Sequence, residues 1–172
     1  MRLNALRKSA LIPWREVADW RCQACGNCCI GYRVPLKMDE MVQVYKRYGQ
    51  SVLEFGLGKA YLRNRRDGRC VFQRPLMDRW ICTLQGTKPT ACRLFPFRIY
   101  RKPVYKHGEN ARATINNQVC YLYLDPECQG IQLGQPTPHF RDQVVPEVLR
   151  IGMGFPVKQK YTTSTSIHWR PI

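Results

Sequence analysis

Four cysteines lie within eight residues near the start of the chain, in the order Cys22, Cys25, Cys28 and Cys29. A gap of two residues lets two thiolates approach one cation while the backbone turns between them, and Gly26 permits a tight turn. The first three cysteines also have the C-x2-C-x2-C spacing of an iron–sulfur ligand run. Because the side chains of adjacent residues tend to diverge, we expect Cys28 and Cys29 to serve two different sites or the wall between two sites.

The chain is rich in cysteine and poor in histidine, with nine cysteines and three histidines. This balance predicts coordination by thiolates alone, which suits zinc or an iron–sulfur cluster and argues against calcium or magnesium. The five cysteines outside the first cluster are Cys70, Cys82, Cys92, Cys120 and Cys128.

A disulfide framework is the alternative use of so many cysteines. Residues 1–20 contain six charged side chains and no apolar stretch of signal-peptide length, so they do not resemble a secretory leader. The odd number of cysteines and the adjacent pair also fit disulfides poorly. We therefore favour metal binding and expect a cytoplasmic protein. No apolar run approaches the length of a membrane span, so no membrane association is expected.

The formal net charge is +16, and the excess is concentrated in residues 59–112, where fourteen Lys and Arg face three Asp and Glu. A basic face of this kind indicates a polyanionic partner, and RNA or a ribonucleoprotein such as the ribosome is the partner that we predict. Two alternatives stay open, because arginines also balance the charge of thiolates and keep a protein soluble. The predicted contact residues are Arg63, Arg65, Arg66, Arg69, Arg98, Arg101, Lys102 and Lys106.

The length of 172 residues is that of one domain. Periodicity predicts helices over 39–48 and 139–152, the second interrupted at Pro146, with short helical segments near 61–62 and after Pro89. We expect hairpin arms at 70–72 and 79–82, strands at 97–101 and 113–124, and an edge strand or extended arm after residue 155. The predicted fold is a small α+β domain, irregular and metal-stabilised, with short β-hairpins, a few short helices and cysteine knuckles. It divides into a basic N-terminal segment (1–21), a cysteine-cluster domain (22–131), and a C-terminal helix and tail packed on that domain (132–172).

With these motifs in place, the chain resembles the YkgJ family of CxxCxxCC cysteine-cluster proteins, which are described as zinc- or iron-chelating domains. The resemblance covers about residues 20 to 131 and rests on the first cysteine cluster, on Gly68-Arg69-Cys70-Val71-Phe72, on Cys82, on the run from Lys88 to Phe97, and on the run from Asp125 to Ile131. Lys88 stands where the family usually has Arg, Gln129 where it has Pro, and Gln85 where Tyr is common. The resemblance implies a metal-binding domain, sometimes classed as an iron–sulfur oxidoreductase, and some relatives are linked to protein lysine methylation.

The family pattern has eight cysteines, which leaves Cys120 outside it as a buried strand residue. We expect the eight to form two four-thiolate sites, with Cys22, Cys25 and Cys28 in one and Cys29 in the other, and with two zinc ions favoured over an iron–sulfur cluster. The predicted ligands are Cys22, Cys25, Cys28, Cys29, Cys70, Cys82, Cys92 and Cys128.

The leading functional hypothesis is a metal-binding module on RNA or a ribonucleoprotein. An iron–sulfur oxidoreductase or methylation-linked factor, and a structural zinc protein with a protein partner, are the alternatives. Nothing in the sequence indicates a small-molecule substrate or a catalytic residue, which favours a non-enzymatic role.

Overall fold

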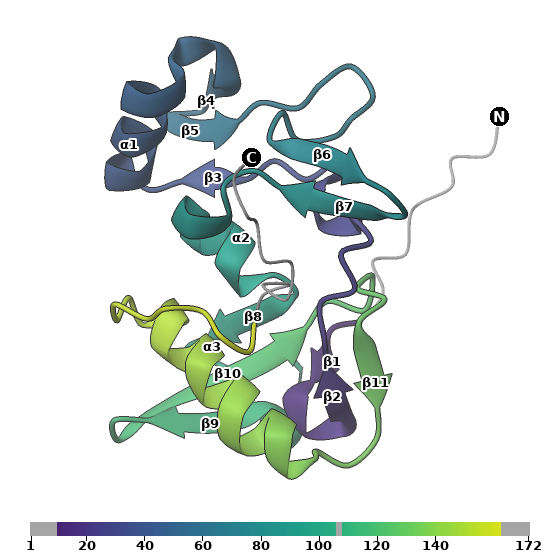
Figure 1. Cartoon of the computed structure of the whole chain (residues 1–172). Helices are drawn as coiled ribbons and strands as arrows, with labels where there is room; N and C mark the ends of the chain where they lie inside the picture. Colours follow the sequence, from purple (N-terminus) through teal and green to yellow (C-terminus); the bar gives the residue numbers. More distant parts are fainter. Residues whose placement is uncertain (1–9, 106–107, 163–172) are drawn as a thin grey trace, which may run out of the picture.

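Two hydrophobic cores organise the computed structural model, which describes residues 10–105 and 108–162 (Figure 1). In chain order the strands are β1 (Ile12–Pro13), β2 (Val17–Trp20), β3 (Pro35–Leu36), β4 (Leu53–Gly56), β5 (Lys59–Leu62), β6 (Gln73–Leu76), β7 (Arg79–Cys82), β8 (Phe97–Tyr100), β9 (Arg112–Ile115), β10 (Gln118–Leu124) and β11 (Ile131–Leu133). The helices are α1 (Met38–Tyr48), α2 (Thr90–Leu94) and α3 (Val145–Gly152), the last preceded by a π-helical turn, Phe140–Val144.

The first core lies between a four-stranded antiparallel sheet and α3, in the lower half of Figure 1. Strand β10 is central to this sheet and pairs with β1, β8 and β9. Leu122 and Leu124 of β10 are fully buried against Phe140 and Val148. The short sheet formed by β2 and β11 closes one side, where Trp20 packs edge-on against Phe97 at 5.1 Å between ring centroids.

The second core fills the upper half, where α1 covers the sheet β3-β5-β4 and the hairpin β6–β7 lies beside it. Val44 of α1 packs against Leu53 and Leu62, and the ring of Tyr48 lies 4.9 Å from that of Phe72. Acidic residues occupy the first turn of α1. Gly49 follows its last turn with φ +77°, so the helix ends at the predicted glycine.

The structure corrects several local predictions. The predicted strand 113–124 is a hairpin, because Asn116 and Asn117 both have positive φ and form the tight turn between β9 and β10. The helical segment expected near residues 61–62 is strand β5, which is held between β3 and β4. The hairpin expected from residue 70 begins at Gln73, so Cys70 lies in the loop before it.

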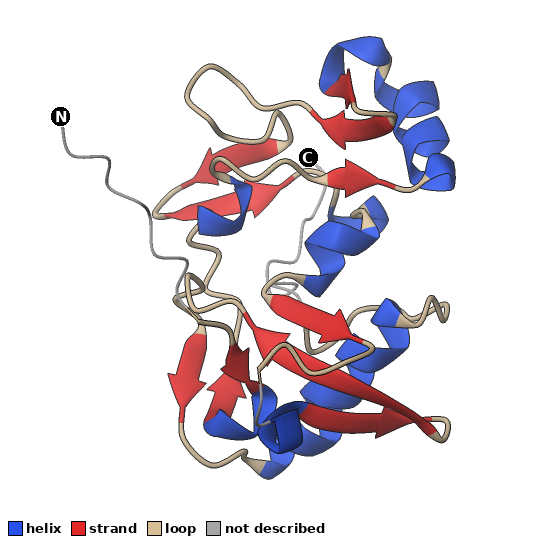
Figure 2. Cartoon of the chain, turned by 180° about the vertical axis from the view of Figure 1, so that it is seen from behind, coloured by secondary structure: helices blue, strands red, loops and turns tan. Residues whose placement is uncertain are grey.

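Over residues 10–105 and 108–152 the chain crosses between the two cores twice. Residues 21–34 carry it from β2 to the upper half, and α2 lies between the halves on the way back to β8 (Figures 1 and 2). The clustered cysteines lie on the first crossing and Cys92 lies on the second. Five thiols therefore lie where the two halves of the fold are connected, while Cys70 and Cys82 belong to the upper half and Cys128 to the lower.

A small α+β fold with several short strands in small sheets and a few short helices is confirmed. The first nine residues of the predicted N-terminal segment and the last ten of the predicted tail lie outside the described residues. No helix within 10–105 and 108–162 is both long enough and apolar enough to cross a bilayer.

Candidate metal centre

The cysteine cluster folds as a knuckle whose turn depends on left-handed backbone at Ala24 (φ +53°) and Gly26 (φ +82°). After Gly26 the chain makes one 3₁₀ turn, Asn27–Cys29, in which the Cys29 N–H donates to the Gly26 carbonyl at 3.0 Å. The Trp80 N–H of β7 donates to the Ala24 carbonyl at 2.8 Å, which joins the knuckle to the β6–β7 hairpin. The turn required by the C-x2-C spacing is therefore formed.

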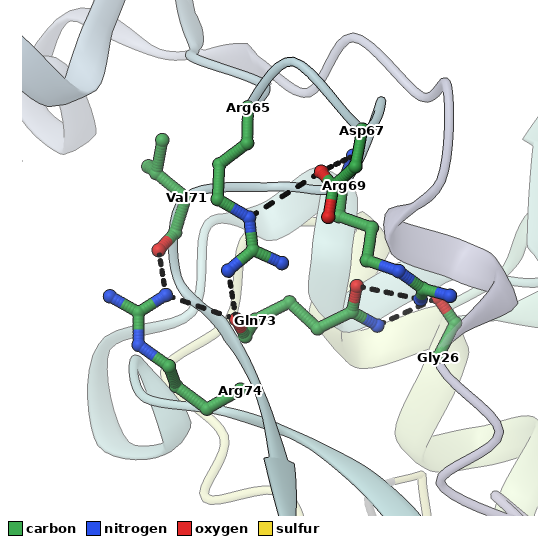
Figure 3. A network of polar contacts seen from close by, with 7 residues as sticks. All are labelled: Gly26, Arg65, Asp67, Arg69, Val71, Gln73 and Arg74. Atoms are coloured by element: carbon green, nitrogen blue, oxygen red, sulfur yellow. Dashed lines mark hydrogen bonds and ion pairs between the residues drawn. The ribbon is translucent and has the colours of Figure 1, made fainter.

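Gln73, at the start of β6, holds the knuckle in place (Figure 3). Its side chain is 2% exposed, and its Nε2 donates to the Gly26 carbonyl at 2.8 Å while Arg69 donates to its Oε1 at 3.3 Å. A Cβ atom at Gly26 would overlap Gln73 Nε2 and lie 2.8 Å from Trp80 Cβ, so only glycine fits at this contact. Arg65 and Arg74 donate to the backbone carbonyl of Gln73 at 3.2 and 3.1 Å.

Five of the predicted ligands are brought toward one another beside the second core. The Cys28 and Cys29 Sγ atoms lie 3.7 Å apart, and the Cys70 N–H donates to the Cys29 carbonyl at 2.8 Å. Cys82 ends β7 and Cys92 lies on α2, and both pack with Cys29 and Cys70 against this core.

The expectation that the adjacent pair diverges is wrong, because the 3₁₀ turn at residues 27–29 directs both side chains the same way. Their separation of 3.7 Å is close to the edge of a tetrahedron of sulfurs around zinc, about 3.8 Å for Zn–S bonds of about 2.3 Å. Cys28 therefore lies beside Cys29 in this structure, and the sharing of one site by Cys22, Cys25 and Cys28 stays a prediction.

The thiols of this group affect one another electrostatically. The hydrogen bond that Cys28 shares with Cys29 lowers the pKa of Cys28 to about 7, with Lys88 acting in the same direction. The same hydrogen bond, together with burial, raises the pKa of Cys29. Burial is the main cause that raises the pKa values of Cys82 and Cys92, and the charges of neighbouring cysteines add to it. Thiolates in these positions therefore require a nearby cation.

The other three predicted ligands form a separate group at the edge of the first core. Trp20 Nε1 donates to Cys128 Sγ at 3.3 Å, and the Arg21 N–H donates to the Gly130 carbonyl at 3.1 Å. These hydrogen bonds bring the loop of Cys128 to the start of the knuckle. Burial raises the pKa of Cys128, and the charges of Cys22 and Cys25 raise it further, because those thiols lie close by.

The donor chemistry of both groups fits a soft or borderline metal, because all nine cysteines are free thiols and no disulfide links them. The spacing is wider than a bound ion requires. Within residues 10–105 and 108–162, no three Cys, His, Asp or Glu side chains stand close enough to hold one metal ion. The thiols therefore lie in two groups, but the sulfur atoms of each group would have to move closer together to bind one ion.

Cys120 lies apart from both groups. It is 2% exposed on β10, and its Sγ lies 3.7 Å from the Ala113 carbonyl on β9. This environment is that of a small apolar side chain in a strand, as expected for the one cysteine outside the family pattern.

The predicted nucleic-acid residues divide into two sets. Arg65 lies 3.5 Å from Asp67, the Arg69 guanidinium lies 3.8 Å from the centroid of the Trp80 ring, and Arg98 pairs with Asp125 at 3.2 Å. These three brace the fold. Four others are exposed, and Lys106 lies outside the described residues; the exposed residues are Arg63, Arg66, Arg101 and Lys102.

Two contributors to the site were not predicted from the sequence. Gln73 holds the knuckle, and Lys88 lies near enough to Cys28, Cys82 and Cys92 to lower their pKa values in part. The position of Lys88 within the motif that contains Cys92 was a signal that could have identified it. Nothing in the sequence around Gln73 distinguishes it from a surface glutamine.

We expect Gln73→Ala to lower the free energy of unfolding by about 2–3 kcal/mol, because the buried Gly26 carbonyl loses one of its two donors and a cavity opens beneath the knuckle. Urea unfolding followed by tryptophan fluorescence measures this decrease. Gln118→Ala on the exposed end of β10 is the matched control and should change stability by no more than about 0.5 kcal/mol. Equal effects of the two substitutions would show that Gln73 does not hold the knuckle.

Comparison with known families gives a match that covers both thiol groups. The model of the family CxxCxxCC, described as "Putative zinc- or iron-chelating domain", matches residues 21–128, more than half of the 172-residue chain. Comparison with curated proteins and with solved structures finds no match. The matched region begins one residue before Cys22 and ends at Cys128, so it spans all eight predicted ligands. The chain belongs to the CxxCxxCC family of zinc- or iron-chelating domains.

Proposed function

We propose that the protein is a metal-binding module in which two groups of thiolates cross-link the segments that connect the halves of the fold. The observation that supports this most directly is the gathering of five free thiols from four separate segments beside one core, without a disulfide. Burial keeps thiols of this kind neutral unless a cation accompanies them, and a bound metal deprotonates thiols and supplies that charge.

The proposed ligand sets follow the two groups. Cys29, Cys70, Cys82 and Cys92 provide four thiolates for one ion, with Cys28 beside them. Cys22, Cys25 and Cys128 provide three for the second ion, and Cys28 is the fourth thiol available to it, since only two residues separate it from Cys25. A closed set of four thiolates makes a structural site, which contributes folding energy directly.

Zinc is the metal that we propose, because the ligands are spread over about a hundred residues of a small domain that gains most from cross-links. An iron–sulfur cluster is the alternative, and it would supply electron transfer. Either metal requires reduced thiols, which is the reason for proposing the cytoplasm as the compartment. Among the described residues we assign no catalytic group beside the thiols, so the proposed role is structural.

We expect Cys25→Ser and Cys82→Ser each to lower metal content by about one ion per chain and to reduce the yield of soluble protein. The physical reason is that an incomplete ligand set leaves its segment uncrosslinked. Elemental analysis of protein purified without oxygen measures the metal. Cys120→Ser is the control and should retain the wild-type metal content, because its thiol lies apart from both groups. If all three variants retain the same metal, the ligand assignment is wrong.

Binding of RNA or a ribonucleoprotein is the second function that we propose. It is supported by the net charge of +16 and by four exposed basic side chains of the predicted set, Arg63, Arg66, Arg101 and Lys102. The three arginines that brace the fold are less available for this role. The metal centres offset only part of the excess charge, because a zinc ion with four thiolates carries a formal charge of about −2.

We expect the full-length protein to bind single-stranded RNA with an affinity that falls steeply as salt rises, because each neutralised phosphate releases counterions. The log–log slope should be about −0.7 per neutralised phosphate. Fluorescence anisotropy with a labelled oligouridylate across a salt series measures it. Absence of binding at low salt, or an affinity that salt does not change, would contradict RNA binding and favour a structural zinc protein with a protein partner.

A further inference from the structure

Three depressions on the surface neighbour one another through shared lining residues, and together we call them the furrow. The widest, about 950 Å³, lies between α1, the segment 85–93 and the strap that follows α3, residues 154–159. A depression of about 350 Å³ shares Phe155, Pro156 and Val157 with it. The third, about 370 Å³, lies between β9 and α3 and shares Arg150 with the second. Because neighbouring depressions have lining residues in common, their linings follow one another over the surface from α1 to β9.

Cationic side chains gather at both ends of the furrow, and Arg150 is the cation that lines its middle depression. Its wide end carries Lys46 and Arg47 on α1, with Lys88 and Lys158 facing them from other segments. Its narrow end carries Arg15, Arg112 and Arg150. Ten Lys and Arg line the three depressions, against two carboxylates. One of the two, Glu40, already accepts hydrogen bonds from Lys37 and Thr90.

The strap that borders the furrow is fixed at its far end. Glu147 of α3 is 7% exposed, and its carboxylate accepts hydrogen bonds from the backbone N–H groups of Lys160, Tyr161 and Thr162 at 2.8 to 3.1 Å. Gln159 Nε2 donates to the Arg93 carbonyl at 3.2 Å. These hydrogen bonds fold the strap back onto α2 and α3, so the wall of the furrow is a built part of the structure.

We propose that this furrow binds a single strand of nucleic acid. The cations follow one another along a track, which suits a chain of phosphates better than one phosphate group. Phe155 is 44% exposed where the wide and middle depressions meet, and an aromatic side chain in a basic groove is a surface on which a base stacks. This inference rests on the proposed binding of RNA and locates it on different residues from those predicted.

The furrow contains basic residues that the predicted contact surface does not include. Arg15, Lys46, Arg47 and Arg150 all lie outside residues 59–112, the segment in which the charge excess is densest in sequence. The fold joins these scattered residues to Lys88 and Arg112. The segment with the most basic residues in the sequence therefore predicted a different part of the surface from the one in which the depressions lie.

The test compares two charge reversals in the furrow with one outside it. Lys46→Glu/Arg47→Glu changes the wide end and Arg112→Glu/Arg150→Glu changes the narrow end, while Lys59→Glu/Arg79→Glu makes the same change of charge at residues that belong neither to the furrow nor to the predicted contact set. All six side chains are exposed, so folding should survive, and melting curves check this. The probes are a labelled oligouridylate and oligothymidylate of about 12 nucleotides, with inorganic phosphate and polyglutamate as competitors.

We expect each furrow variant to weaken binding at least about tenfold and to reduce the salt slope by about 0.7 for each phosphate that is no longer neutralised. The control should weaken binding by no more than about threefold, and Phe155→Ala should weaken it without changing the slope. The oligouridylate and oligothymidylate arms show whether the strand is RNA or DNA.

Three results would contradict the binding of a nucleic-acid strand in the furrow. The first leaves nucleic-acid binding intact, and the other two indicate a different ligand. If the wild type binds and both furrow variants match the control, the strand lies elsewhere. If only the wide end matters and inorganic phosphate competes, the site takes a single phosphate. If polyglutamate competes as well as the oligonucleotide, the partner is an acidic protein. Failure of the wild type to bind either strand would instead reject the proposed function, and the furrow with it.

Discussion

Gly26 lies so close to Gln73 and Trp80 that no larger side chain fits, and the arrangement of the thiols depends on this contact. It holds the turn of the knuckle against the β6–β7 hairpin, which ends at Cys82. The following 3₁₀ turn then places the Cys28 and Cys29 sulfurs 3.7 Å apart, facing the second core. Without this contact, the cysteines of the knuckle would not be held near Cys82. The hairpin is short and leaves one face exposed, so it does not fix their position by itself.

The two thiol groups combine cysteines on the segments that connect two separate hydrophobic cores with cysteines at the cores themselves. The group around Cys29 joins the knuckle, the loop of Cys70, β7 and α2, while the group around Cys128 joins the knuckle to the edge of the first core. In the proposed metal-bound protein, the relation between the two halves would depend on coordination as well as on packing. A small domain with two modest cores gains more from such cross-links than a large one does.

Much of the fold was predictable where the pattern is local. Helix α1, the short helix with Cys92 and the strand after Pro96 follow from periodicity and from Gly and Pro positions. The hairpin at Asn116–Asn117 was missed although two adjacent asparagines are a turn signal, because the β-rich run on both sides was interpreted as one strand. Strand β5 was missed because its pairing partners β3 and β4 stabilise it, and sequence-local propensity does not contain that information.

The candidate site was likewise predictable from the sequence only in part. The candidate ligands were visible in the cysteine spacing, whereas the close approach of Cys28 and Cys29 was not, because adjacency in sequence says little about which way a turn directs two side chains. The convergence of Cys28 and Cys29 follows from one 3₁₀ turn. Likewise, Arg65, Arg69 and Arg98 could be counted as surface charge from the sequence, but only the fold shows that they contact Gln73, Trp80 and Asp125.

X-ray absorption at the metal edge, on protein purified without oxygen, tests the central claim most directly. It identifies the metal and the atoms bound to it in one experiment. The account predicts about two zinc ions per chain, each with sulfur neighbours alone at about 2.3 Å. A shell dominated by nitrogen or oxygen, or a chain that carries no metal while its cysteines remain reduced, would contradict it.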